Sequence, residues 1–260
     1  MVLGTVLGLE PGLVAASIYL DRDQLYRFPG SAAPWPVKRR LCVTELLKAH
    51  AILESSRENM GLCFDIKPAP DKDAAAAARQ IAANVASFEK RFGALRQSGR
   101  HLHHDSVVRV LRTVCSKVPP KPVDFANGTW LEVYVWSLLR TASAKHGISD
   151  VQQSVNLDNG SAAGKEPATD LDVAYAWNNQ LRFVSCKTGV ADALKDEVFH
   201  VAARQRQVGG TFGRGALLHW HPSGRKGVRA AELAAKQLKV PIFGRELLQN
   251  ETALVQALVD

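Results

Sequence analysis

The sequence has no long apolar run. Nowhere do its 260 residues approach the ~20 consecutive apolar residues that a membrane-spanning helix needs. The apolar N-terminus has no basic segment before it and is interrupted by Glu10 and Pro11, which is not the pattern of a secretion signal. We expect residues 2–9 to form a buried β-strand, and we expect the protein to be cytoplasmic with no membrane partner.

Cysteine is scarce and scattered. The four cysteines form no Cys-x-x-Cys pair, which argues against a zinc site and a disulfide framework and suits a reducing compartment. The segment His101-Leu-His103-His104 has no second His or Cys pair at ligand spacing, so we favour a loop at the start of a helix over a metal site. No Ser-His-Asp arrangement is evident either. These absences leave little support for a zinc-bound or serine-hydrolase site.

Acidic residues are outnumbered, since 25 Asp and Glu stand against 33 Lys and Arg, and the formal net charge is +8. A basic balance favours polyanionic partners, although charge alone is weak evidence. Arg204, Arg206 and Arg214 are candidates for holding the phosphate backbone of a nucleic acid. An ordinary solvated face explains these arginines equally well. The charge therefore indicates nucleic acid as a partner without locating a site.

Prolines divide the chain. Pro119, Pro120 and Pro122 break secondary structure, and we place a domain boundary there, between domains 1–120 and 121–260. The first domain is expected to be small and mostly helical, or a reduced Rossmann-like domain. Its predicted elements are a helix begun within residues 11–19, helices over 37–60, 71–95 and 106–118, and a short strand over 62–66.

Beyond the boundary, the apolar pattern alternates between helix and strand. We predict helix, three strands, helix and strand, an order typical of an α/β sandwich, and then two more helices with a short strand between them. The helices are expected over residues 128–146, 191–208, 228–238 and 245–258, and the strands over 151–157, 171–177, 181–186, 215–220 and 240–243.

The segment 169–189 is predicted to be a hairpin that carries acids and a lysine. Asp170 and Asp172 are two residues apart, so their side chains share one face of the strand. The turn, at two consecutive asparagines, brings Ser185 and Lys187 back onto that face. A carboxylate pair binds Mg²⁺ or Mn²⁺ through oxygen, and a lysine beside the metal can position the attacking water and stabilise charge on a phosphate.

Glu132 is the other candidate acid. It lies early on the predicted helix, in Gly128-Thr-Trp-Leu-Glu132, among apolar residues. An acid in such surroundings is otherwise awkward to place, and pointing at a metal would explain it. Taken singly, Asp170, Asp172 or Lys187 is best explained as a solvated surface charge. Together and in this order, Glu132 and these three residues favour metal-dependent hydrolysis of nucleic-acid phosphodiesters.

These motifs together resemble a known family. The segments Gly-x-Trp-Leu-Glu, Thr169-Asp-Leu-Asp-Val and Cys186-Lys-Thr are similar to the PD-(D/E)xK nuclease domain of CRISPR-associated effectors. Two later segments, Gly209-Gly-Thr-Phe-Gly-Arg-Gly-Ala-Leu-Leu and Arg229-Ala-x-Glu-Leu-Ala, also resemble that family. The resemblance covers about residues 125–258 and implies a restriction-endonuclease-like fold, nuclease activity and a role in antiviral defence.

The resemblance also implies roles for individual residues. Glu132 and Asp172 would bind Mg²⁺ or Mn²⁺, Lys187 would be the catalytic lysine, and Asp170 would be a supporting acid and further metal ligand. The sequence departs from the family at Ser185, where the pattern has an acid. Either the second carboxylate comes from elsewhere in the chain, with Glu132 and Asp170 as candidates, or the site is weakened.

Family members are dimers in which a cyclic-oligoadenylate sensor of the CARF fold precedes the nuclease. The resemblance thus implies a homodimer and cyclic oligoadenylate as an activating ligand. The region before the boundary is short and helical for a full sensor, so a small helical domain for dimerisation or nucleic-acid docking is the other interpretation. A rival function is a catalytically silent protein that binds nucleic acid or cyclic nucleotides. The sequence does not distinguish DNA from RNA.

Overall fold

The computed structural model describes residues 17–21, 24–28, 35–36, 40–47, 63–97, 102–158, 169–209 and 213–260. The strand expected over residues 2–9 lies outside these ranges, as does most of the helix expected over 37–60, of which residues 43–47 are helical. Within the described ranges, no helix has the length and apolar character needed to cross a membrane.

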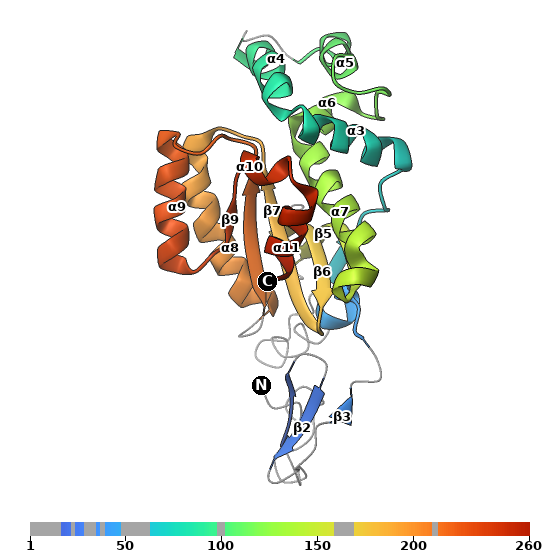
Figure 1. Ribbon diagram of the computed structural model, residues 1–260, viewed down its shortest axis with the longest axis vertical. Coiled ribbons are helices and arrows are strands. Elements are labelled where there is room, and N and C mark those ends of the chain that lie inside the picture. The colour runs from blue at the N-terminus through green and yellow to red at the C-terminus, as the bar shows by residue number, and fades with distance from the viewer. Residues whose placement is uncertain are drawn as a thin grey trace.

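A six-stranded mixed sheet forms the centre of the molecule (Figure 1). The first four strands in its order pair antiparallel, and the last two are added in parallel. In spatial order the strands are β4 (Cys63–Ile66), β5 (Ile148–Asp158), β6 (Thr169–Trp177), β7 (Gln180–Lys187), β8 (Arg214–His219) and β9 (Ile242–Phe243).

The hairpin between β6 and β7 forms where the sequence predicted it. Asn178 and Asn179 have φ angles of 49° and 57°. A two-residue turn with both φ angles positive matches the right-handed twist of the two strands, and asparagine tolerates that conformation better than most residues do. The turn sets the register, with Trp177 opposite Gln180.

Helices cover both faces of the sheet (Figure 1). On one face α8 (Leu194–Gly209) and α9 (Lys226–Leu238) pack against residues such as Phe183 and Leu217. On the other face α7 (Trp130–His146) and α11 (Glu251–Val259) pack against residues such as Tyr175. The Tyr175 hydroxyl donates to the carbonyl of Leu258 at 2.5 Å, and the Tyr134 hydroxyl donates to that of Leu248 at 2.6 Å. The first bond fixes α11 to the sheet, and the second fixes the segment Arg245–Leu248 to α7.

The remaining elements after the proline cluster are short. They are α6 (Pro122–Asp124), the π-helix η1 (Phe125–Thr129), the 3₁₀-helix η2 (Ala191–Ala193) and α10 (Arg245–Leu248). The helix predicted over residues 245–258 is therefore two helices, because Asn250 caps α11 by accepting from the amide of Ala253.

The region before residue 120 contains helices, a small sheet and the strand β4 of the central sheet. The single helix predicted over 71–95 is two, α3 (Lys72–Ala83) and α4 (Val85–Gln97), which are separated at Asn84. Next comes α5 (His104–Arg112), which starts two residues before the helix predicted over 106–118 and ends six residues before its predicted end. The prediction that a helix begins within residues 11–19 is wrong for residues 17–19, because these residues belong to a strand. That strand is part of a small antiparallel sheet of β1 (Ser17–Asp21), β2 (Gln24–Phe28) and β3 (Trp35–Pro36).

The expected fold class is confirmed: the chain is α/β, with a helix-covered sheet in its C-terminal half and a smaller, mostly helical part before it. The regions before and after residue 120 contribute to one sheet and one apolar core. The strand β4 extends the central sheet by pairing with β5, and α3, α4 and α5 contribute to the same apolar core as α7. The division into domains at residue 120 stays a prediction.

Candidate active site

The sheet opens at the base of the β6–β7 hairpin. Pairing between the two strands extends only to Val173 and Val184. Beyond that point β6 continues to pair with β5 as far as Thr169, and β7 continues to pair with β8 as far as Lys187. The two strands thus separate, and the opening exposes backbone groups that side chains can use.

Asp172 lies in this opening. Its Oδ2 atom accepts hydrogen bonds from the amide of Cys186 at 2.6 Å and from the hydroxyl of Ser185 at 3.3 Å. The side chain is buried, and burial raises its pKa above the ordinary value, while the Lys187 charge and the Cys186 amide act in the opposite direction. Ser185 therefore does not carry a carboxylate into the site; it orients the carboxylate that is there.

The neighbouring strand β5 is irregular at the same level. Ser154 has a φ of 49°, and the β5–β6 ladder has no pair between Gln153–Val173 and Val155–Leu171. At this irregularity the apolar side chains change faces: Val173 belongs to the α7 side of the core, and Val155 and Leu171 belong to the α8 side. Because of this change of face, polar side chains in the middle of β5 face α7.

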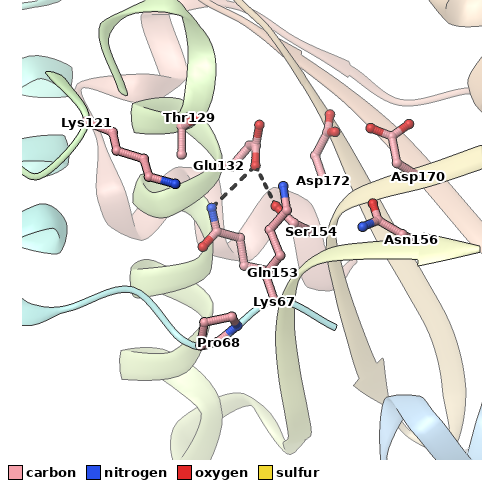
Figure 2. Close-up of a pocket in the computed structure, with 10 residues that line it drawn as sticks. All are labelled: Lys67, Pro68, Lys121, Thr129, Glu132, Gln153, Ser154, Asn156, Asp170 and Asp172. Atoms are coloured by element: carbon pink, nitrogen blue, oxygen red, sulfur yellow. Dashed lines mark hydrogen bonds between the residues drawn. The ribbon is translucent and has the colours of Figure 1, made fainter. Parts of the chain in front are cut away.

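Those polar side chains hold Glu132, which α7 projects toward the opening. The Oε2 atom of Glu132 accepts from Ser154 Oγ at 3.1 Å and from Gln153 Nε2 at 3.3 Å, as the dashed lines in Figure 2 show. Burial and the charge of Asp172 raise the pKa of Glu132 to about 7. The negative charge of Asp172 thus favours the protonated form of Glu132.

Lys187 faces a carboxylate on each side. Its Nζ atom lies 3.3 Å from Glu197 Oε2 on α8. Burial lowers the pKa of Lys187, but the charges of Asp172 and Glu197 raise it further, so that the net pKa is above the ordinary value. The amine therefore stays charged at neutral pH.

Asp170 lies at the edge of the site, and its predicted role as a supporting acid and metal ligand stays a prediction. Its side chain is exposed, and Oδ1 lies 3.3 Å from Arg204 Nη2 on α8. Asp172 thus lies within electrostatic range of both Glu132 and Lys187, Asp170 lies at the rim, and the Lys187 amine pairs with Glu197 on α8.

The predicted basic residues contact different elements. Arg204 is the partner of Asp170. Arg206 is exposed, and it is two residues further along α8, which places it on a different side of the helix. Arg214 is exposed and donates to the carbonyl of Asp260 at 3.3 Å.

A pocket of about 340 Å³ surrounds the acids. Several residues in it carry no motif and were not identified from the sequence, among them Lys67, Lys121 and the Glu132 partners on β5. One signal was available, since Gln153 and Ser154 interrupt an apolar strand with polar residues. The lining residues are Lys67, Pro68, Lys121, Thr129, Glu132, Gln153, Ser154, Asn156, Asp170 and Asp172 (Figure 2).

The donor atoms suit a hard divalent cation. Within the described ranges, no three His, Cys, Asp or Glu side chains converge on one point. Glu132 and Asp172 each use one oxygen for the bonds that orient them, and the other oxygen has no hydrogen bond to any described residue. Mg²⁺ is commonly bound by one or two carboxylates and keeps several water ligands. Two oriented carboxylates with free oxygens fit that requirement.

The molecule has a helix-covered α/β sheet with acids at its opening, and the sequence motifs around these acids resemble those of a nuclease domain. Residues 121–256 match the family described as "Card1-like, endonuclease domain". The chain belongs to this Card1-like endonuclease family. No protein of curated function is detectably similar to it in sequence.

Two of the solved structures to which the chain is similar share its fold, protein VC1899 and Can2. Protein VC1899 from Vibrio cholerae superposes with a TM-score of 0.68 at 18% identity, over 94% of this chain and 69% of that one. Can2 from Sulfobacillus thermosulfidooxidans, in complex with cyclic tetra-adenylate, gives 0.61 at 17% identity, over 94% and 67%. A type III CRISPR defence DNA nuclease activated by cyclic oligoadenylate gives 0.47 at 21% identity, over 85% and 30%.

Proposed function

We propose that this protein is a metal-dependent endonuclease that hydrolyses phosphodiester bonds of DNA or RNA in CRISPR-linked antiviral defence. The observation that carries the proposal is the oriented Glu132–Asp172 pair beside the charged Lys187, at the opening of the sheet. Membership of the Card1-like endonuclease family and the fold shared with Can2 support it.

Each residue has a role that follows from its surroundings. Glu132 and Asp172 would hold Mg²⁺ or Mn²⁺ through their free oxygens. The bound metal would supply charge stabilisation and a more acidic water. Lys187, whose pKa is raised by its two acidic neighbours, acts as a fixed positive charge for the phosphate and not as a base. Asp170 remains a supporting acid through its pair with Arg204.

Cleavage assays test the proposal directly. Labelled single- and double-stranded DNA and RNA are incubated with the protein in Mn²⁺, Mg²⁺ or EDTA. Lys187→Ala is expected to lower kcat by about 100-fold or more, in line with the removal of one electrostatic donor in other enzymes. Lys195→Ala, at an exposed lysine on α8, is the matched control. Cleavage that persists in EDTA or in Lys187→Ala overturns the mechanism.

The second candidate function is a silent binding protein with the same fold, and it is favoured by Ser185. Serine supplies Asp172 with a hydrogen bond where the motif has a charged acid. A silent protein would show no stabilisation by Mn²⁺, so the melting temperature with and without the metal separates the two candidates.

We also propose that cyclic oligoadenylate activates the protein through residues before 121, as a homodimer. The fold shared with Can2, whose structure contains cyclic tetra-adenylate, supports this proposal. Cyclic tetra-adenylate added to the cleavage assay is expected to raise kcat, and light scattering measures the oligomeric state. Equal rates with and without the ligand would contradict activation.

A further inference from the structure

Two lysines enter the pocket from elements outside the β6–β7 hairpin. Lys67 directly follows β4, and Lys121 directly precedes α6. Figure 2 shows both ammonium groups directed into the pocket, toward the side of Glu132 that carries its Ser154 and Gln153 bonds. Lys67 is close enough for its charge to lower the pKa of Glu132, against the larger effects that raise it.

The backbone at both lysines is held in place. Lys121 has φ 50° and ψ 59°, a left-handed conformation that is unfavourable for a residue with a side chain. The amide of Lys67 donates to the carbonyl of Ser154 at 3.4 Å, and Ser154 is itself left-handed. Conformations of this kind cluster at functional sites, where the surrounding fold stabilises them and so places a side chain.

Neither ammonium group has a hydrogen bond or an ion pair with another residue in the part of the chain that the structure describes. The pocket thus has a carboxylate side suited to a metal and a second side with two exposed ammonium groups that no described residue pairs. A nucleic-acid strand matches both sides, because its phosphates can contact the metal and the lysines at once.

We propose that Lys67 and Lys121 form a subsite for a backbone phosphate of the substrate strand, next to the phosphate that is cleaved. This inference rests on the proposed nuclease function. It makes a segment before the family-matched region part of the substrate site, since Lys67 precedes residue 121.

Binding and cleavage together test the subsite. Binding of labelled DNA and RNA is measured on the Lys187→Ala background, with and without the double change Lys67→Ala/Lys121→Ala. The double change is expected to weaken binding at low salt by about 10-fold or more. It should also reduce the slope of log affinity against log salt by about 1 for each phosphate that the protein no longer neutralises. In the protein with Lys187 intact, KM should rise and kcat should stay within about twofold.

The control pair is Lys195→Ala/Lys236→Ala, which removes the same charge from exposed positions on α8 and α9. Lys67→Arg/Lys121→Arg should keep most of the affinity. If wild-type protein cleaves and the alanine pair keeps its KM and salt slope, the subsite is overturned and the nuclease stands. If wild-type protein binds no nucleic acid, both are overturned. Weaker binding of cyclic tetra-adenylate by the alanine pair, with nucleic-acid binding unchanged, would also overturn the subsite.

A second observation concerns Arg96 on α4. Its guanidinium donates to the carbonyl of Thr188 at 3.1 Å and to the carbonyl and Oδ1 of Asn127 at 3.1 Å and 2.9 Å. The Thr188 hydroxyl in turn donates to the Asn127 carbonyl at 2.6 Å. Thr188 directly follows Lys187, and Asn127 lies in the π-helix that leads into α7 and Glu132. One side chain therefore ties together the two segments that carry the catalytic groups.

We infer that Arg96 is a positioning residue for Lys187 and Glu132. Small displacements of catalytic groups cost large factors in rate, so Arg96→Ala is expected to lower kcat by about 10-fold or more with KM within about twofold. The pH at which kcat reaches half its maximum should also move, because the surroundings of Glu132 change. Arg91→Ala, an exposed position on the same helix, is the control.

Added guanidinium ion should restore part of the kcat of Arg96→Ala. A purely structural role would lower the melting temperature and the active fraction without moving the pH profile, and that result would overturn the inference. An unchanged kcat would overturn it as well.

Discussion

The pair of buried carboxylates makes the metal-free protein less stable as the pH rises, and Glu132→Gln should remove most of that effect. The pKa of Glu132 is about 7 in the folded protein, against an ordinary value of 4.5. Between these pH values the folded state binds more protons than the unfolded state, so the free energy of unfolding falls with rising pH. The difference corresponds to about 3 kcal/mol, fully expressed above pH 7.

The assay is urea or thermal unfolding in EDTA from about pH 4.5 to 8, with wild-type protein beside Glu132→Gln. The variant is expected to gain about 3 kcal/mol on the wild type across this range, or roughly 6–12 °C in melting temperature at the upper end. Taking the difference between the two proteins cancels the titration of other groups. Mn²⁺ should stabilise the wild type at pH 8 and have little effect on the variant, which lacks one charged ligand.

Two results would refute the reasoning. One is a variant no more stable than wild type at pH 8 in EDTA, and the other is a stability difference that does not depend on pH. Either would mean that Glu132 is not confined beside Asp172 as an acid with a raised pKa, and the case for a metal held by the pair would lose its electrostatic support.

Three further predictions concern other parts of the structure. Burial lowers the pKa of His219 to about 4 from 6.5. The free energy of unfolding should therefore be highest above pH 6.5 and fall by about 3 kcal/mol toward pH 4. Acid unfolding curves of His219→Gln should lack this fall. Ser185→Asp places a carboxylate about 4 Å from Asp172 and should cost about 4 kcal/mol in EDTA, a destabilisation that Mn²⁺ reduces; equal stability in EDTA would contradict it. Gly227→Ala puts a Cβ atom at the backbone of Ala191 and displaces α9 from η2. The free energy of unfolding, measured with denaturant, should fall by about 1–3 kcal/mol. An unchanged denaturation midpoint would show that the packing there relaxes freely.

Much of the C-terminal fold follows from local sequence. The apolar alternation along β6 and β7 and the two asparagines between them were sufficient to predict the hairpin and the position of its turn. The helix–strand order after the proline cluster was sufficient to predict the α/β class. The acids on β6 and the lysine on β7 follow from the same hairpin, and so their proximity was also predictable. Element ends were less predictable, as the breaks at Asn84 and Asn250 show.

The rest of the site depends on contacts between residues far apart in the sequence. Nothing local indicates that Asp170 would turn to Arg204, which lies 34 residues away. The left-handed Ser154 sits in a run that otherwise predicts a regular strand, and its conformation is a consequence of the pocket that it helps to form. Lys67 reaches the pocket only when β4 joins the sheet beside β5, and Lys121 reaches it from the start of α6.

The serine at position 185 is consistent with an active site once the charges are considered together. Burial raises the pKa of both Asp172 and Glu132, and the charge of Asp172 raises that of Glu132 further. A third buried acid would add repulsion that a bound cation would offset. Ser185 supplies a neutral donor that, with the Cys186 amide, holds one oxygen of Asp172 and leaves the other free. Glu132 is held in the same manner from β5. Under the proposed function, α7 would then provide the second carboxylate that the motif requires, and the site would keep two oriented acids with fewer buried charges.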